Sequence, residues 1–128
     1  MIDEMQKMEM AFYINHFDGF TFNPTLGEFH EGGGYAVAAS RGDWLEFDLN
    51  QITVEKAVSE AWARFLEAFT EDLEYCFGAW VDGDRLVFDP SVILSNYEDA
   101  VKMACLLQQD AIWDMGRMCE IRLSEVSL

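Results

Sequence analysis

Residues 76–90 read CFGAWVDGDRLVFDP, and this stretch decides the fold. Two largely apolar runs, Cys76–Val81 and Arg85–Asp89, flank the tripeptide Asp82-Gly83-Asp84. An Asp-Gly pair between apolar runs is a strong signal for a tight hairpin, so the stretch predicts two antiparallel strands. Proline has no backbone N–H to donate, and we expect Pro90 to end the second strand.

Two helices are expected on either side of this hairpin. Before it, the i, i+3, i+4 spacing of apolar residues predicts an amphipathic helix over residues 54–73, with Thr53 as its N-cap. The apolar positions are Val54, Ala57, Val58, Ala61, Trp62, Phe65, Leu66 and Phe69. After the hairpin, Ser95 and Glu98 have the spacing of a capping box, which predicts a helix over residues 96–109.

The remaining segments predict short strands and connecting loops. We expect strands at 10–17, 35–39, 44–49, 111–114 and 119–123, a loop at 25–34 and a turn at 40–43. Residues 20–22 are expected to continue the first strand in extended form up to Pro24. The order β-β-β-α-β-β-α-β-β indicates an α+β fold, an antiparallel sheet of about five to seven strands with two helices on one face. The other face would be left for solvent or a partner. We expect a short tail or lead-in at 1–9, one domain at 10–123 and a C-terminal tail at 124–128.

Charge is the strongest functional signal in the chain. Asp and Glu number 24 against 8 Lys and Arg, which gives a net charge of −16 over 128 residues. A domain of this size is roughly 30 Å across, and about 30 Å of duplex DNA carries roughly 18 phosphate charges. The aromatic content of 14% is too high for a disordered acidic chain. We therefore expect a folded protein with the charge of a DNA segment of its own length.

Six carboxylates are candidates for contact with a basic partner. Four glutamates of the first predicted helix lie within about 60° of one another on a helical wheel, interrupted by Arg64 alone. Two aspartates come from the hairpin, where they add to the same negative potential. An ordinary solvated helix face is the alternative interpretation of the glutamate row. The six candidate residues are Glu60, Glu67, Glu71, Glu74, Asp82 and Asp84.

Sequence motifs for catalysis are missing from the chain. It contains neither a G-x-S-x-G element nor a phosphate-binding G-x-x-x-x-G-K-[ST] loop. The cysteines Cys76, Cys105 and Cys119 are scattered, as in a protein of a reducing cytoplasm. His16 and His30 do not pair with them in sequence, so we expect no metal site and no cofactor. An enzyme with a divalent metal bound by carboxylates is the alternative class.

Membranes and nucleic acids are not expected partners. There is no run of 18 apolar residues, so no membrane-spanning helix is predicted, and an acidic surface is repelled by anionic leaflets. Phosphate contacts need clustered Lys and Arg, whereas the eight here are scattered along the chain.

The chain has four tryptophans, which are candidate interface anchors. Trp62 lies on the apolar face of the first predicted helix and is expected in the core. Trp44, Trp80 and Trp113 lie on predicted strands. We expect each of these three in the core, with a place on the open sheet face as the alternative, since tryptophan is frequent at interfaces.

A spaced pattern over most of residues 19–122 resembles small proteins from phages and other mobile elements. The pattern consists of GFT (19–21), GYAVA (34–38), GAWVD (78–82), FDPS (88–91), Ala100, QDAIWD (109–114) and EI (120–121). The resemblance implies a shared fold and carries no catalytic residues over to this chain. It also implies a setting of phage or plasmid cargo, in which small acidic proteins are often anti-CRISPR or antirestriction proteins.

Together these observations favour a non-enzymatic acidic inhibitor of a nucleic-acid-binding host defence complex, with a CRISPR effector favoured. The protein would act as a DNA mimic in the cytoplasm of a bacterial host cell, because its carboxylates would take the places of phosphates. One alternative is an immunity protein that neutralises a basic nuclease toxin. Another is a phage accessory or assembly protein that self-associates through the open sheet face, for example as a homodimer.

Overall fold

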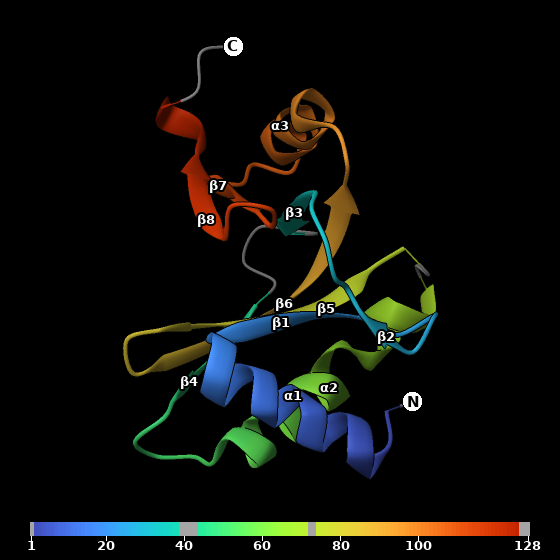
Figure 1. Ribbon diagram of the computed structural model, residues 1–128, viewed down its shortest axis with the longest axis vertical. Coiled ribbons are helices and arrows are strands. Elements are labelled where there is room, and N and C mark those ends of the chain that lie inside the picture. The colour runs from blue at the N-terminus through green and yellow to red at the C-terminus, as the bar shows by residue number, and fades with distance from the viewer. Residues whose placement is uncertain (1, 39–43, 72–73, 126–128) are drawn as a thin grey trace.

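The computed structural model describes residues 2–38, 44–71 and 74–125. Within them the chain forms three α-helices and an eight-stranded sheet in which every pairing is antiparallel (Figure 1). The expected α+β class with an antiparallel sheet is confirmed, with one helix more than expected. The turn expected at 40–43 lies outside the described residues, as do residues 126–128 of the expected C-terminal tail.

The strand order places β6 at the centre of the fold. The elements are α1 (Glu4–Phe17), β1 (Gly19–Asn23), β2 (Glu28–Phe29), β3 (Tyr35–Ala38), β4 (Leu45–Asp48), α2 (Val54–Glu71), β5 (Cys76–Asp82), β6 (Arg85–Leu94), α3 (Tyr97–Leu106), β7 (Ala111–Asp114), β8 (Cys119–Arg122) and a short 3₁₀ helix (Leu123–Glu125). The sheet runs β2-β1-β5-β6-β3-β7-β8. On the side away from β5, the first four residues of β6 pair with β4 and its last four residues pair with β3.

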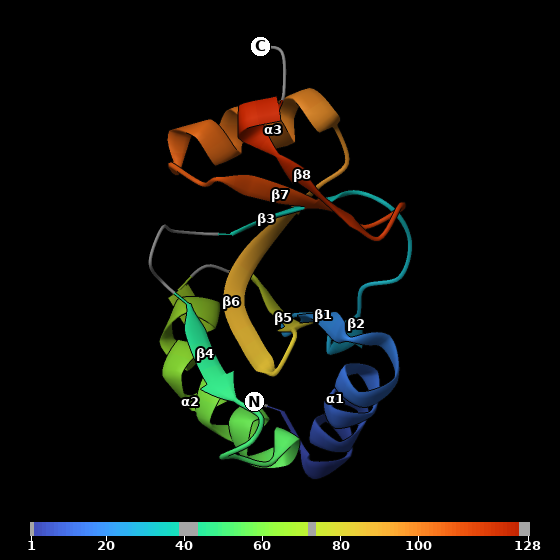
Figure 2. The ribbon, with the colours of Figure 1, turned by 90° about the vertical axis from the view of Figure 1, so that its left-hand side faces the viewer.

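Strand β6 joins two parts of the molecule, as Figure 2 shows. Leu86 and Phe88 belong to a large core beneath α1 and α2, whereas Leu94 packs against a smaller core beneath α3. The pairing continues in register from Arg85 to Leu94, so these three side chains point to one face of the sheet. All three helices therefore cover the same face, in two groups.

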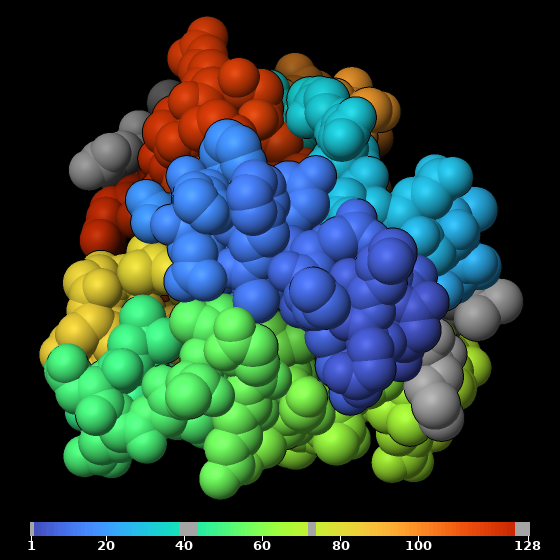
Figure 3. All heavy atoms as spheres, turned by 60° about the horizontal axis from the view of Figure 1, so that its bottom comes forward, coloured from blue at the N-terminus to red at the C-terminus, as the bar shows by residue number. Residues whose placement is uncertain are grey.

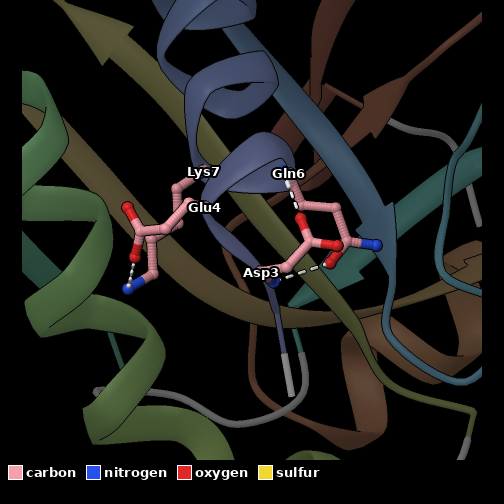
Figure 4. A network of polar contacts seen from close by, with 4 residues as sticks. All are labelled: Asp3, Glu4, Gln6 and Lys7. Carbon is pink, nitrogen blue, oxygen red and sulfur yellow. Dashed lines mark hydrogen bonds and ion pairs between the residues drawn. The ribbon is translucent and has the colours of Figure 1, made fainter.

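The N-terminal segment differs most from expectation. Residues 10–17, expected as a strand, belong to helix α1, and residues 4–9 form its first turns. Asp3 and Gln6 make a capping box (Figure 4): Gln6 N–H donates to Asp3 Oδ1 at 2.7 Å, and Asp3 N–H donates to Gln6 Oε1 at 3.0 Å. The strand prediction was wrong because α1 is apolar on two opposite sides, which hides the helical period.

Three other boundaries follow from local hydrogen bonding. Thr53 Oγ1 accepts from Lys56 N–H at 3.2 Å, which confirms Thr53 as the N-cap of α2. The capping box expected at Ser95 and Glu98 is wrong, because Asn96 is the N-cap of α3 and accepts from Asp99 N–H at 3.0 Å. Helix α3 accordingly spans residues 97–106 rather than 96–109. Helix α2 is described to Glu71, and residues 72–73 of its expected range lie outside the described residues.

Pro90 does not end strand β6, contrary to expectation. The strand continues to Leu94. Pro90 lies between Phe88, where the pairing of β6 with β4 ends, and Ser91, where its pairing with β3 begins. A residue without an N–H is tolerated at this gap between two partner strands.

Candidate functional site

The face of the sheet opposite the helices carries no helix among the described residues, and we call it the helix-free face. Its side chains form rows across the strands. Nearest the β5–β6 hairpin, Arg85 lies between Asp48 and Asp82. The next row holds Glu46, Val87, Trp80 and Gly19, and the third holds Asp89, Gly78 and Thr21. Strands lie about 4.8 Å apart, so Glu46 and Trp80 are separated by about 10 Å at their backbones.

Three tryptophans are exposed rather than buried. The register places Trp80 and Trp113 on the helix-free face. Trp44 immediately precedes β4, two residues before Glu46 and therefore on the same side as Glu46. Their exposed fractions are 52% for Trp44, 42% for Trp80 and 39% for Trp113. The expectation that each lies in the core is wrong, because strand alternation turns them away from the helices. Trp62 is buried in the large core, as expected.

One end of the helix-free face is strongly acidic. Glu46, Asp48, Asp82 and Asp84 gather there, and we call them the acidic edge. Arg85 is the cation among them, with Nε 4.0 Å from Asp84 Oδ1. Asn50 Nδ2 donates to Asp84 Oδ2 at 3.3 Å, which ties the loop after β4 to the hairpin. One arginine against four carboxylates leaves a local excess of negative charge.

The six carboxylates expected from sequence do not form one surface. Glu60, Glu67 and Glu71 are exposed on α2, which packs against the other face of the sheet. Glu74 lies beyond the described end of α2 and just before β5, so the helical-wheel row does not extend to it. Asp82 lies at the far end of β5, about 20 Å along the strand from its start, and Asp84 lies in the turn that follows.

Two residues of the acidic edge, Glu46 and Asp48, are not among the six expected carboxylates. A signal for them is present in the sequence WLEFD at 44–48. Alternation in a strand puts Trp44, Glu46 and Asp48 on one side and the two apolar residues on the other. Strand periodicity, applied to this segment, would have found this part of the site.

A buried polar pair lies at the centre of the helix-free face. Asp89 and Ser91 are each 5% exposed, and Ser91 Oγ donates to Asp89 Oδ1 at 2.7 Å. Gly78 lies beside Asp89 on β5 and leaves space for this carboxylate. Hydrogen bonding is what makes a buried polar group tolerable, so this pair is a structural anchor between the two parts of the sheet.

A cavity of about 740 Å³ lies between the β1–β2 turn and the end of β6, and Cys76 and His30 both line it. Burial raises the pKa of the Cys76 thiol to about 11. The thiol therefore stays protonated near neutral pH and is not an activated nucleophile. His30 Nε2 lies within hydrogen-bond distance of the Gly33 carbonyl oxygen, at 3.0 Å. In the described part of the chain, no group of three or more His, Cys, Asp or Glu residues is arranged to hold a metal ion.

Comparisons of the chain with protein-family models, with curated proteins and with solved structures find no match. Over residues 2–38, 44–71 and 74–125, no helix combines the length and the apolarity needed to cross a membrane. Surface chemistry and geometry are therefore the basis for a functional proposal.

Proposed function

We propose that the protein is a non-enzymatic acidic inhibitor that occupies the basic groove of a nucleic-acid-binding host defence protein. A CRISPR effector is the target class we favour, and the bacterial cytoplasm is the setting. The observation that carries the proposal is the exposure of Trp44 and Trp80 beside the acidic edge on the helix-free face. This combination of flat aromatic surface and excess carboxylate suits a partner rich in Arg and Lys.

The chemistry of such a contact has two parts. The carboxylates of the acidic edge would take positions that phosphates occupy when the groove binds nucleic acid. The tryptophan rings would accept Arg or Lys side chains through cation–π contacts, and tryptophan is a frequent hot spot of binding energy. A net charge of −16 also steers the protein toward a positive groove and raises the association rate.

A pull-down from host lysate, with bound proteins identified by mass spectrometry, tests this proposal. Exposed charge contacts are screened by salt, so we expect capture at about 0.1 M salt and loss at about 0.5 M. The variant D82K/D84K reverses two charges of the acidic edge. The matched control E67K/E71K changes the net charge equally, on α2 at the helix-covered face.

The outcomes of this experiment lead to different conclusions. Loss of capture by D82K/D84K with capture retained by E67K/E71K supports the helix-free face as the contact surface. The reverse pattern would assign binding to α2 instead, and no effect of either variant would exclude electrostatic mimicry. Capture of a basic nuclease toxin in place of a defence protein would instead indicate that the protein is an immunity protein.

The variant W80A separates a defined contact from general charge attraction, because it leaves the charge unchanged. Trp80 is partly exposed, so its replacement is not expected to prevent folding. As a hot spot it would weaken binding by about 2 kcal/mol or more. Equal binding by W80A and the unaltered protein would remove the aromatic part of the proposal.

A further inference from the structure

Helix α1 has an apolar stripe on the side that faces away from the core. Its inner side buries Met10, Ala11 and Ile14. At 100° per residue, Met5 lies about 180° around the helix from Ile14, and Phe12 about 160°. Met5 is 69% exposed, Met8 70% and Phe12 51%. Contiguous exposed apolar surface of this kind marks interaction sites in monomeric proteins.

The stripe lines a groove of about 460 Å³, which we call the α1 groove. Figure 3 shows α1 at the surface of the molecule, next to α2. Its walls are held by aromatic contacts: the Tyr13 ring stacks on Phe29 with centroids 4.6 Å apart, and the Phe12 ring lies 4.4 Å from that of His16. The lining residues are Met5, Met8, Glu9, Phe12, Tyr13 and Phe17.

The side chains that line the groove suit the apolar face of a helix. Helix α1 has 14 residues, a length of about 21 Å, which matches about four turns of a partner helix. Met8 and Phe12 are separated by one helical turn, the spacing at which an amphipathic helix presents its own apolar side chains. Methionine side chains are flexible and polarizable, so they adapt to such apolar anchors.

The negative charge near the groove indicates a positively charged partner. Glu9 lines the groove, and further exposed carboxylates lie on or next to α1 at Asp3, Glu4 and Asp18. Lys7 is the cation on α1 and is paired to Glu4 at 3.5 Å. We propose that the α1 groove binds a basic amphipathic helix of a partner protein. A second copy of the chain is a poorer occupant, because it would bring another net charge of −16 against this surface.

This site is separate from the one proposed above. Helix α1 packs on the helix-covered face of the sheet, whereas the acidic edge belongs to the opposite face. Binding to the α1 groove would therefore survive the variant D82K/D84K. The failure of one proposal does not entail the failure of the other.

A fluorescein-labelled peptide of Leu and Lys, about 18 residues long and amphipathic as a helix, is the probe. Its binding is measured by fluorescence anisotropy at about 0.15 M salt. We expect the variant M8Q/F12Q to bind at least about tenfold more weakly than the unaltered protein. The matched control L106Q removes an apolar side chain that is 84% exposed on α3, and its binding should be unchanged.

Circular dichroism checks that M8Q/F12Q is folded. If it is not, peptide binding is measured with the single variant M5Q in its place. Equal binding by the unaltered protein and these variants would overturn the proposal. So would equal binding of a scrambled Leu/Lys peptide with no apolar face, because charge alone would then explain the affinity. Sedimentation velocity completes the test: a dimer abolished by M8Q/F12Q would assign the groove to a second copy.

Discussion

The carboxylate of Asp89 lies against the backbone of Gly78 on the neighbouring strand, so that a Cβ built at Gly78 would lie 2.9 Å from Asp89 Oδ1. The same Cβ would lie 3.3 Å from the Ser91 hydroxyl, which donates to that carboxylate. Both polar side chains are buried. Glycine at position 78 is thus what allows an Asp–Ser pair at the centre of the helix-free face.

The substitution Gly78→Ala tests this arrangement. Inserting a methyl group here must displace a buried hydrogen-bonded carboxylate, and overpacking costs about 1–3 kcal/mol. The measurement is the free energy of unfolding in urea. Gly33→Ala is the control, because a Cβ at Gly33 meets nothing within 4 Å and should change stability by less than about 0.5 kcal/mol. Equal stability of the two variants would contradict this reading of the site.

The helical conformation of α1 gives a prediction for Met8 and Met10 that a strand would not give. Met10 is fully buried and Met8 is 70% exposed, whereas in a strand the two would point to the same side. Met10→Ala should lower the free energy of unfolding by about 2–5 kcal/mol, and Met8→Ala should change it by less than about 0.5 kcal/mol. Thermal or urea unfolding measures both, and similar losses in the two variants would speak against the helix.

The start of helix α3 gives a third prediction. Asn96 accepts the hydrogen bond from Asp99 N–H, so Asn96→Ala should lower the free energy of unfolding by about 1 kcal/mol. Ser95→Ala removes the hydroxyl of the neighbouring exposed residue and should be close to neutral. If Ser95→Ala proved the more costly of the two in urea unfolding, the N-cap would be Ser95, as the sequence spacing suggested.

Cysteine alkylation gives a prediction with a defined pH dependence. Burial raises the pKa of Cys76 to about 11, and the thiolate is the reactive form. At pH about 8, iodoacetamide should modify the exposed Cys105 and Cys119 and leave Cys76 largely unmodified. Alkylation of Cys76 should increase as the pH rises toward the Cys76 pKa of about 11. Mass spectrometry counts the adducts, and three adducts on the native protein at pH about 8 would contradict the burial of Cys76.

Elements with strong local signals were predicted well. Helix α2 follows from its single apolar face and the Thr53 cap. The β5–β6 hairpin follows from Asp82-Gly83-Asp84, of which Gly83 and Asp84 form the turn. Helix α1 was not predicted, because its apolar residues face both the core and the solvent. The spacing of Asp3 and Gln6 before an apolar run was the signal available for its start.

The sequence by itself determined the charge of this protein, its fold class and, through the alternation at residues 44–48, which side chains share one side of a strand. Only the tertiary structure decided which carboxylates lie together. Pairing of β4 with β6 places Glu46 and Asp48 on the same face of the sheet as Asp82, across Arg85, while α2 holds Glu67 and Glu71 at the other face. The physical reason is that this pairing joins residues about 40 positions apart. Its register depends on how the whole apolar core packs, which no local pattern encodes.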